Sequence, residues 1–168
     1  AIESFIKQGG SFGVATGRME RTTLIKFPQL KTNIPSIFYN GAVVFDTNSQ
    51  AYILNHTMPT GLQPLFMDIM TRYPSCGIEI NADGKAYIVR HNEIVAEQIE
   101  REGIEGLFVS WDEVPEKWYK ALFVDENDIL QKIKADLDKV ERNDINIMFS
   151  EEKLLDMMAK DISKGRTL

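Results

Sequence analysis

Three short segments of this sequence combine residue types that suit a phosphoryl group. They are Thr16-Gly17-Arg18, Asn40-Gly41 and Ser163-Lys164-Gly165. A hydroxyl donates one hydrogen bond, a glycine lets a ligand approach the main chain, and a guanidinium offers a planar charged fork to phosphate oxygens. Each segment alone is also typical of an ordinary turn or helix cap. Their value as a site therefore depends on whether the fold brings them together.

The expected elements place the first two segments where strands end. A helix over 1–8 is followed by a short apolar strand at 12–15, a helix before Pro28 and a strand at 34–39, and a pair of strands follows at about 42–46 and 51–55. Strands separated by helices predict a parallel α/β sheet. In such a sheet ligands gather at the strand ends, and helix N-termini attract anions.

The middle of the chain has a different pattern. Apolar residues recur at helical spacing from Thr60 onward, and two strands joined by a hairpin turn follow at about 76–82 and 86–91. The remaining pattern predicts helices near 92–102 and 127–142 and strands near 118–124, 145–149 and 154–159. Asp136 and Asp138 lie inside the second of these helices, where we expect a solvated face. The sequence thus predicts an α+β unit of about a hundred residues.

Composition narrows the possible functions. The chain has 168 residues, of which 43% are hydrophobic and 26% charged, a balance typical of a globular protein. Its net charge of −6 argues against nucleic acid as a partner. Cys76 is the single cysteine, so a reducing, cytoplasmic location is expected, and no apolar run is long enough to predict a membrane partner. His56 and His91 lack partners at metal-ligand spacing, and the oligomeric state stays open.

The order and spacing of the three segments resemble the Cof-type branch of the haloacid dehalogenase (HAD) superfamily. In that family a strand ends in Thr-Gly-Arg, an Asn-Gly-Ala segment follows, a cap domain is inserted, and a Ser-Lys-Gly segment comes after the cap. The resemblance covers essentially the whole chain. It implies an α/β fold with a partial Rossmann-like HAD core at 1–57 and 161–168 and an inserted α+β cap domain of the C2 type at 58–160.

The resemblance also implies an activity. Family members of this kind are magnesium-dependent phosphatases that act on small phosphorylated metabolites, such as sugar phosphates, through an aspartyl-phosphate intermediate. By this resemblance the hydroxyl of Thr16 bonds the transferring phosphoryl group, and the ammonium of Lys164 neutralises the nucleophile and the phosphate. The substrate-binding positions implied are Gly17, Arg18, Asn40 and Gly41.

One departure from the family pattern is large. The Asp-x-Asp-Gly-Thr motif that carries the nucleophile and the Gly-Asp-x-x-Asn-Asp motif that binds Mg²⁺ do not occur in this sequence. We expect them before Ala1 and after Leu168, so we expect no metal ligand within these residues and no turnover by this chain alone. Two alternatives stay open: a non-catalytic ligand-binding or interaction module, and a phosphomutase-like phosphotransferase.

Overall fold

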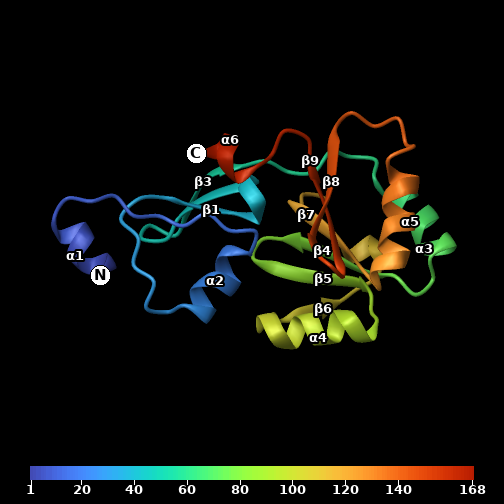
Figure 1. Cartoon of the computed structure of the whole chain (residues 1–168), viewed down its shortest axis with the longest axis horizontal. Helices are drawn as coiled ribbons and strands as arrows, with labels where there is room; N and C mark the ends of the chain where they lie inside the picture. Colours follow the sequence, from blue (N-terminus) through green and yellow to red (C-terminus); the bar gives the residue numbers. More distant parts are fainter. The chain divides into compact units, whose positions relative to one another are not determined.

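The computed structural model describes all 168 residues and divides them into two compact units (Figure 1). Unit 1 comprises residues 1–56 and 161–168, and unit 2 comprises residues 57–160. No helix has the length and apolar composition needed to cross a lipid bilayer.

Unit 1 is built on a three-stranded antiparallel sheet in the order β1-β2-β3. The strands are β1 (Ser36–Phe38), β2 (Val43–Asp46) and β3 (Ala51–Asn55). Its helices are short: α1 (Ile2–Lys7), α2 (Glu20–Lys26), the 3-10 turn η1 (Tyr39–Gly41) and α6 (Lys164–Thr167). The buried apolar side chains come mainly from β1, η1 and β2, namely Ile37, Phe38, Tyr39, Val43 and Phe45.

The strand expected at 12–15 is reduced to a single parallel bridge between Ala15 and Ile37. Pro35 explains the difference, because it lacks the N–H that would extend the ladder toward Phe12. The backbone oxygen of Phe12 instead accepts a hydrogen bond from the backbone N–H of Asn33, at 3.0 Å. The parallel pairing expected for this part of the chain is therefore confined to one bridge, and the paired strands of unit 1 run antiparallel.

Unit 2 contains a six-stranded sheet in the order β6-β5-β4-β7-β9-β8. Every neighbouring pair is antiparallel except β5 and β6. The strand bounds are β4 (Gly77–Ala82), β5 (Lys85–Arg90), β6 (Gly106–Phe108), β7 (Lys120–Val124), β8 (Ile145–Glu151) and β9 (Leu154–Ala159).

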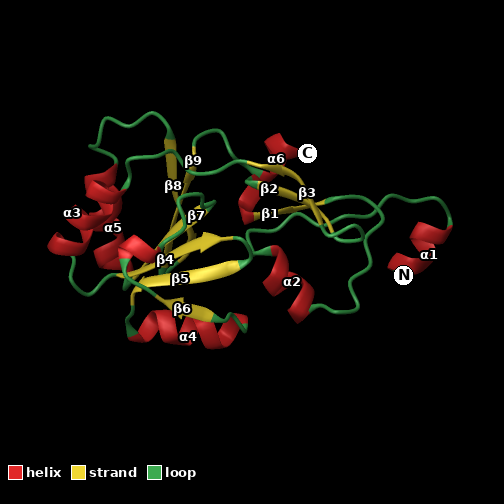
Figure 2. Ribbon diagram, turned by 180° about the vertical axis from the view of Figure 1, so that it is seen from behind, coloured by secondary structure: helices red, strands yellow, loops and turns green.

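Helices cover both faces of this sheet (Figure 2). α3 (Gln63–Arg72) and α5 (Asn127–Leu137) pack their apolar sides on one face, against Ile78 and Ile80 of β4. α4 (Glu93–Glu102) lies against the opposite face, since its residues contact Gly77 and Glu79, which alternate with those isoleucines along β4. The 3-10 turn η2 (Trp111–Glu113) completes the unit.

Two elements of unit 2 differ from the sequence-based expectation. Strand β6 was not predicted, because three residues are too few to show a periodicity. Helix α5 ends at Leu137 and not near Arg142. Past Leu137 the apolar Val140 is exposed, and Arg142 donates to the backbone oxygens of Thr60 and Gly61, so the chain bends where packing against the sheet stops.

Asp136 and Asp138 also behave differently from each other. Asp138 is exposed and pairs with Lys134 one helical turn earlier, as a solvated residue does. Asp136 is only partly exposed and accepts a hydrogen bond from the Tyr73 hydroxyl at 2.6 Å. This bond, a second from Lys139 and the nearby Arg72 lower the pKa of Asp136 to about 2. The carboxylate thus ties α5 to the end of α3.

Candidate functional site

The turn η1, between strands β1 and β2, has an unusual backbone. Tyr39, Asn40 and Gly41 all have positive φ angles, of 48°, 58° and 118°. Glycine adopts such angles without strain and asparagine tolerates them, whereas a tyrosine rarely does. The fully buried Tyr39 side chain packs in the core of unit 1, which holds this conformation in place. The sequence pair Asn40-Gly41 therefore marks a tight, well-determined turn.

The loop Thr16-Gly17-Arg18 lies directly against this turn. The backbone N–H of Asn40 donates to the oxygen of Thr16, and that of Tyr39 donates to the oxygen of Arg18, both at 3.1 Å. A β-carbon on Gly17 would lie only 2.5 Å from Oδ1 of Asn40. The Asn40 side chain thus packs directly against Gly17, in space that a larger residue would occupy.

The hydroxyl of Thr16 is oriented by its own loop. Its Oγ1 accepts a hydrogen bond from the backbone N–H of Arg18 at 3.2 Å. Because a hydroxyl carries one hydrogen in addition to its acceptor sites, an oxygen occupied as an acceptor can still donate that hydrogen to a ligand. The geometry suits a hydroxyl that donates to an anionic oxygen.

The third segment reaches the same turn from the far end of the sequence. The Thr167 hydroxyl donates to the backbone oxygen of Gly41 at 2.9 Å and also contacts the oxygen of Ser163. A β-carbon on Gly41 would lie 2.6 Å from the Ser163 backbone. Ser163 caps helix α6 by accepting from the backbone N–H of Arg166, and the exposed Lys164 is the first residue of that helix.

The structure therefore brings all three sequence segments to one side of unit 1, around η1. Thr16, Gly17 and Arg18 contact it from one direction, and the segment that begins with Ser163 and Lys164 contacts it from another. That Thr16 and Lys164 bind one common ligand stays a prediction.

Sequence reasoning missed Glu20 and Thr167. Glu20 follows Arg18 by two residues and is only 5% exposed. Its Oε1 accepts from the Tyr52 hydroxyl at 2.5 Å, whereas Oε2 is buried without a hydrogen-bond partner. A glutamate in the first turn of a helix is ordinary, so nothing in the sequence marks this one as buried. Thr167 had a local signal, because it follows the capping residue Ser163 by one helical turn.

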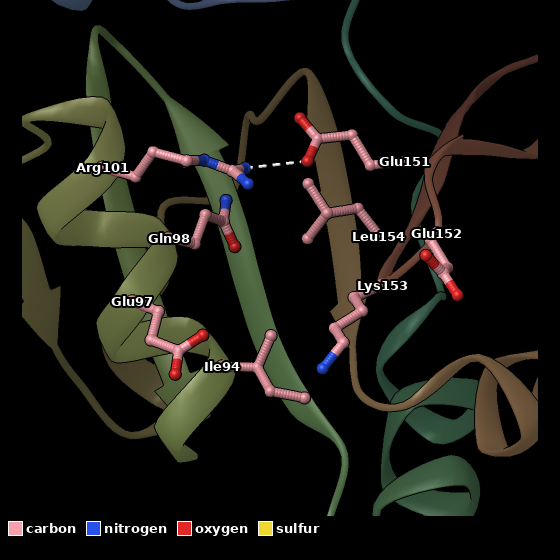
Figure 3. Close-up of a pocket in the computed structure, with 8 residues that line it drawn as sticks. All are labelled: Ile94, Glu97, Gln98, Arg101, Glu151, Glu152, Lys153 and Leu154. Atoms are coloured by element: carbon pink, nitrogen blue, oxygen red, sulfur yellow. Dashed lines mark hydrogen bonds and ion pairs between the residues drawn. The ribbon is translucent and has the colours of Figure 1, made fainter.

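Unit 2 contains a groove of about 450 Å³ that includes none of the predicted site residues (Figure 3). It lies between α4 and the turn from β8 to β9. Its lining residues are Ile94, Glu97, Gln98, Arg101, Glu151, Glu152, Lys153 and Leu154.

The described residues do not form a magnesium site. No group of three or more histidine, cysteine, aspartate or glutamate side chains is placed so that it could hold a metal ion. His91 contacts the ring of Phe108 edge-on and Cys76 is buried. A hard cation such as Mg²⁺ needs several oxygen ligands in near-octahedral geometry, and the structure does not supply them.

Comparison with known protein families shows to which family the chain belongs. A model of the haloacid dehalogenase-like hydrolase family matches residues 1–168, the full sequence. The chain belongs to this family. A comparison with curated proteins gives no significant match.

Solved structures of HAD-like proteins share the fold. A haloacid dehalogenase-like hydrolase from Bacteroides thetaiotaomicron superimposes with a TM-score of 0.86 at 17% identity, over 98% of this chain and 64% of that protein. A protein from Thermotoga maritima gives 0.81 at 20% identity, over 98% and 62%. The HAD subclass IIB sugar phosphatase BT4131 gives 0.78 at 15% identity, over 99% and 63%. These matches confirm the HAD-like α/β fold, and the chain spans less than two thirds of each of these three proteins.

Proposed function

We propose that this HAD-like hydrolase is, as a whole protein, a phosphatase of small phosphorylated metabolites such as sugar phosphates. The observation that carries the proposal is the convergence of Thr16-Gly17-Arg18 and of the segment 163–167, through Ser163 and Thr167, on the turn Asn40-Gly41. The name of the sugar phosphatase BT4131 among its structural relatives supports the choice of substrate class.

Each residue of this site has a different role in binding a phosphoryl group. The Thr16 hydroxyl donates to one phosphoryl oxygen, and the Lys164 ammonium compensates negative charge that develops during transfer. Arg18 offers two parallel N–H groups, and Gly17 leaves the main chain open to the ligand. Phosphoryl transfer depends mostly on such positioning and charge compensation, so preorganised donors of this kind are what the reaction requires.

The nucleophile and the magnesium ligands are not among these groups. The family pattern assigns both to aspartates in motifs that this sequence lacks, and the described residues offer no donor set for the metal. We infer that the complete protein, as a magnesium-dependent phosphatase, takes its nucleophile and its magnesium ligands from carboxylates outside these 168 residues. The present residues bind, orient and neutralise the phosphate.

We further propose that residues 58–160 act as the cap domain and 1–57 with 161–168 as the partial core. Support comes from unit 2, which has its own sheet and hydrophobic core. A cap that closes over the substrate excludes water and selects the leaving group.

The decisive experiment replaces Lys164 in the complete protein. Lys164→Ala should lower kcat on the order of 10²-fold, the effect of losing one preorganised charge donor. Lys160→Ala, which removes a nearby exposed lysine from the loop before α6, is the matched control and should leave kcat unchanged. If Lys164→Ala keeps activity within a few-fold of the unaltered protein, Lys164 is an ordinary surface charge and the proposed site is wrong.

Two further measurements separate the alternatives. The 168-residue chain alone, assayed with an aryl phosphate and Mg²⁺, should show only background hydrolysis, and a robust rate would contradict the assignment of the nucleophile to a missing motif. For the complete protein, release of inorganic phosphate indicates a phosphatase. Transfer of the phosphoryl group to a second hydroxyl would instead indicate a phosphomutase-like enzyme. If the complete protein neither releases phosphate nor transfers the phosphoryl group, it is a non-catalytic module.

A further inference from the structure

The hydroxyl of Thr167 faces two backbone oxygens from distant parts of the sequence. It lies 2.9 Å from the oxygen of Gly41 in η1 and 3.0 Å from the oxygen of Ser163, at the N-cap of α6. A bond from threonine to the oxygen four positions earlier is common in helices and needs no tertiary partner. The bond to Gly41 spans 126 positions, so it reflects the tertiary structure and not the local helix.

Gly41 lies close to the same segment. An ideal β-carbon on this residue would lie 2.6 Å from the Ser163 backbone and 2.9 Å from the Thr167 hydroxyl. Its φ of +118° lies in the region that favours glycine. The absence of a side chain at residue 41 therefore leaves room for the start of α6 against η1.

The turn η1 also contacts the Thr-Gly-Arg loop. Asn40, which directly precedes Gly41, donates its backbone N–H to the oxygen of Thr16 at 3.1 Å. Hydrogen bonds thus connect α6 through Gly41 and Asn40 to Thr16. The two residues proposed to bind the phosphoryl group, Thr16 and Lys164, are attached to one turn although they lie near opposite ends of the sequence.

The other side-chain contacts of α6 are local. Ser163 accepts a hydrogen bond from the backbone N–H of Arg166, and Arg166 pairs with Asp161 at 2.6 Å. Both contacts lie within residues 161–167, so they shape the segment that carries Lys164 but do not attach it to η1. The Thr167 hydroxyl makes that attachment.

We propose that Thr167 is a positioning residue for phosphoryl transfer, because its hydroxyl holds α6 on η1 and thereby holds the Lys164 ammonium beside the phosphate that Thr16 binds. This inference rests on the proposed function. Lys164 compensates charge that develops during transfer, so a displaced ammonium weakens stabilisation of the transition state more than binding of the substrate. Loss of the Thr167 hydroxyl should therefore lower kcat and leave KM nearly unchanged.

The test measures hydrolysis of p-nitrophenyl phosphate by the complete protein with Mg²⁺. Thr167→Val keeps the shape of the side chain and should lower kcat about fivefold, the effect of one hydrogen bond, with KM unchanged. Thr167→Ser retains the hydroxyl and should restore most of the rate. Thr71→Val is the matched control, because it removes a hydroxyl that donates to the backbone oxygen of Met67 within α3 at 2.8 Å, and it should leave kcat unchanged.

A double substitution tests whether Thr167 acts through Lys164. In a Lys164→Ala background, Thr167→Val should lower kcat no further, because the ammonium that Thr167 positions is absent. An equal fall in both backgrounds would show a general structural role and overturn the proposal, as would an unchanged kcat in Thr167→Val alone. Near-normal activity of Lys164→Ala would overturn the proposed phosphate site as a whole, and with it this role for Thr167.

Hydrogen exchange provides a second readout that does not depend on activity. If α6 is attached to the Thr-Gly-Arg loop through η1, Thr167→Val should speed exchange of the Asn40 amide, which bonds to the oxygen of Thr16. Thr71→Val should not change it. If Thr167→Val fails to fold, Thr167→Ala decides in the same measurements. Unchanged exchange at Asn40 would show that loss of the hydroxyl is felt only within α6, and it would overturn the proposal.

Discussion

The side chain of Asn40 occupies the space that a β-carbon on residue 17 would need. An ideal β-carbon on Gly17 would lie 2.5 Å from Oδ1 of Asn40, well inside van der Waals contact. The same asparagine donates its backbone N–H to the oxygen of Thr16. The absence of a side chain at residue 17 therefore leaves room for the Asn40 carboxamide in its present position.

Gly17→Ala should displace the Asn40 carboxamide and destabilise unit 1 by about 1–3 kcal/mol, the usual cost of overpacking. Gly165→Ala is the matched control, because nothing lies within 4 Å of a β-carbon there, and it should change stability little. Urea unfolding of the two variants measures the difference. Equal midpoints would show that the loop at 16–18 yields to the added methyl group.

Gly41→Ala should destabilise the protein in two ways, through backbone strain and through a steric clash. Gly61→Ala tests the backbone strain alone. Gly41 has a φ of +118° and its β-carbon would lie 2.6 Å from the Ser163 backbone, whereas Gly61 has a φ of +73° with open space around it. Gly61→Ala should cost about 1–3 kcal/mol from backbone strain alone. Gly41→Ala should cost clearly more, because the 163–167 segment must also move. A smaller loss for Gly41→Ala in thermal unfolding would mean that this segment is held loosely.

Thr167→Val removes the hydroxyl that joins α6 to the oxygen of Gly41 while it preserves the shape of the side chain. We expect a loss of about 1 kcal/mol in unfolding free energy, typical of one hydrogen bond. Thr167→Ser retains the hydroxyl and should recover most of that loss. Hydrogen exchange at the Thr167 amide, which bonds to the Ser163 oxygen, reports the same difference locally.

The pH dependence of the unfolding free energy should show the effect of burying the Glu79 carboxyl. This carboxyl is 1% exposed, and burial raises its pKa against the hydrogen bonds from Asn81 and Gln98 and the charge of Lys120, which lower it. A group whose pKa is raised by folding contributes stability at pH values below its unfolded-state pKa. That contribution is lost as the pH rises through its folded-state pKa. Glu79→Gln, which stays neutral, should therefore gain stability relative to the unaltered protein between pH 4 and pH 7.

Glu113 should change the pH dependence of stability in the opposite direction to Glu79. Hydrogen bonds from the backbone and hydroxyl of Ser110 lower its pKa, so its contribution is present above the usual carboxyl value and is lost as the pH falls. Glu113→Gln should lose stability relative to the unaltered protein at pH 7, and the gap should close in acid. Urea midpoints measured across this range test both signs. A Glu79→Gln curve parallel to that of the unaltered protein would contradict the role of burial.

Cys76 should be inert in the folded protein. Burial raises the pKa of its thiol to about 12, so the reactive thiolate is scarce at neutral pH, and the side chain is also inaccessible. A thiol-specific disulfide reagent at pH 8 should react at the rate at which the protein unfolds and rapidly in denaturant. Rapid reaction without denaturant would show that the start of β4 opens readily.

The sequence by itself determined those elements whose residues carry a strong local pattern. The apolar spacing in α3 and α4 depends only on the helical period, and Asp83 and Gly84 adopt the positive φ angles of the hairpin turn that their residue types predict. The three short motifs likewise identified the HAD-like family before any geometry was known, since their order along the chain is a property of the sequence.

Tertiary structure alone decided which polar residues are buried and where elements end. Glu20, Glu79 and Gln98 look like ordinary helix or strand residues in the sequence, and their burial comes from partners 19 to 32 positions away. Strand β6 exists because β5 lies beside it, and α5 stops where its packing surface does. The physical reason is the same in each case: burial and strand pairing are long-range interactions, and a local sequence window contains only one of the two partners.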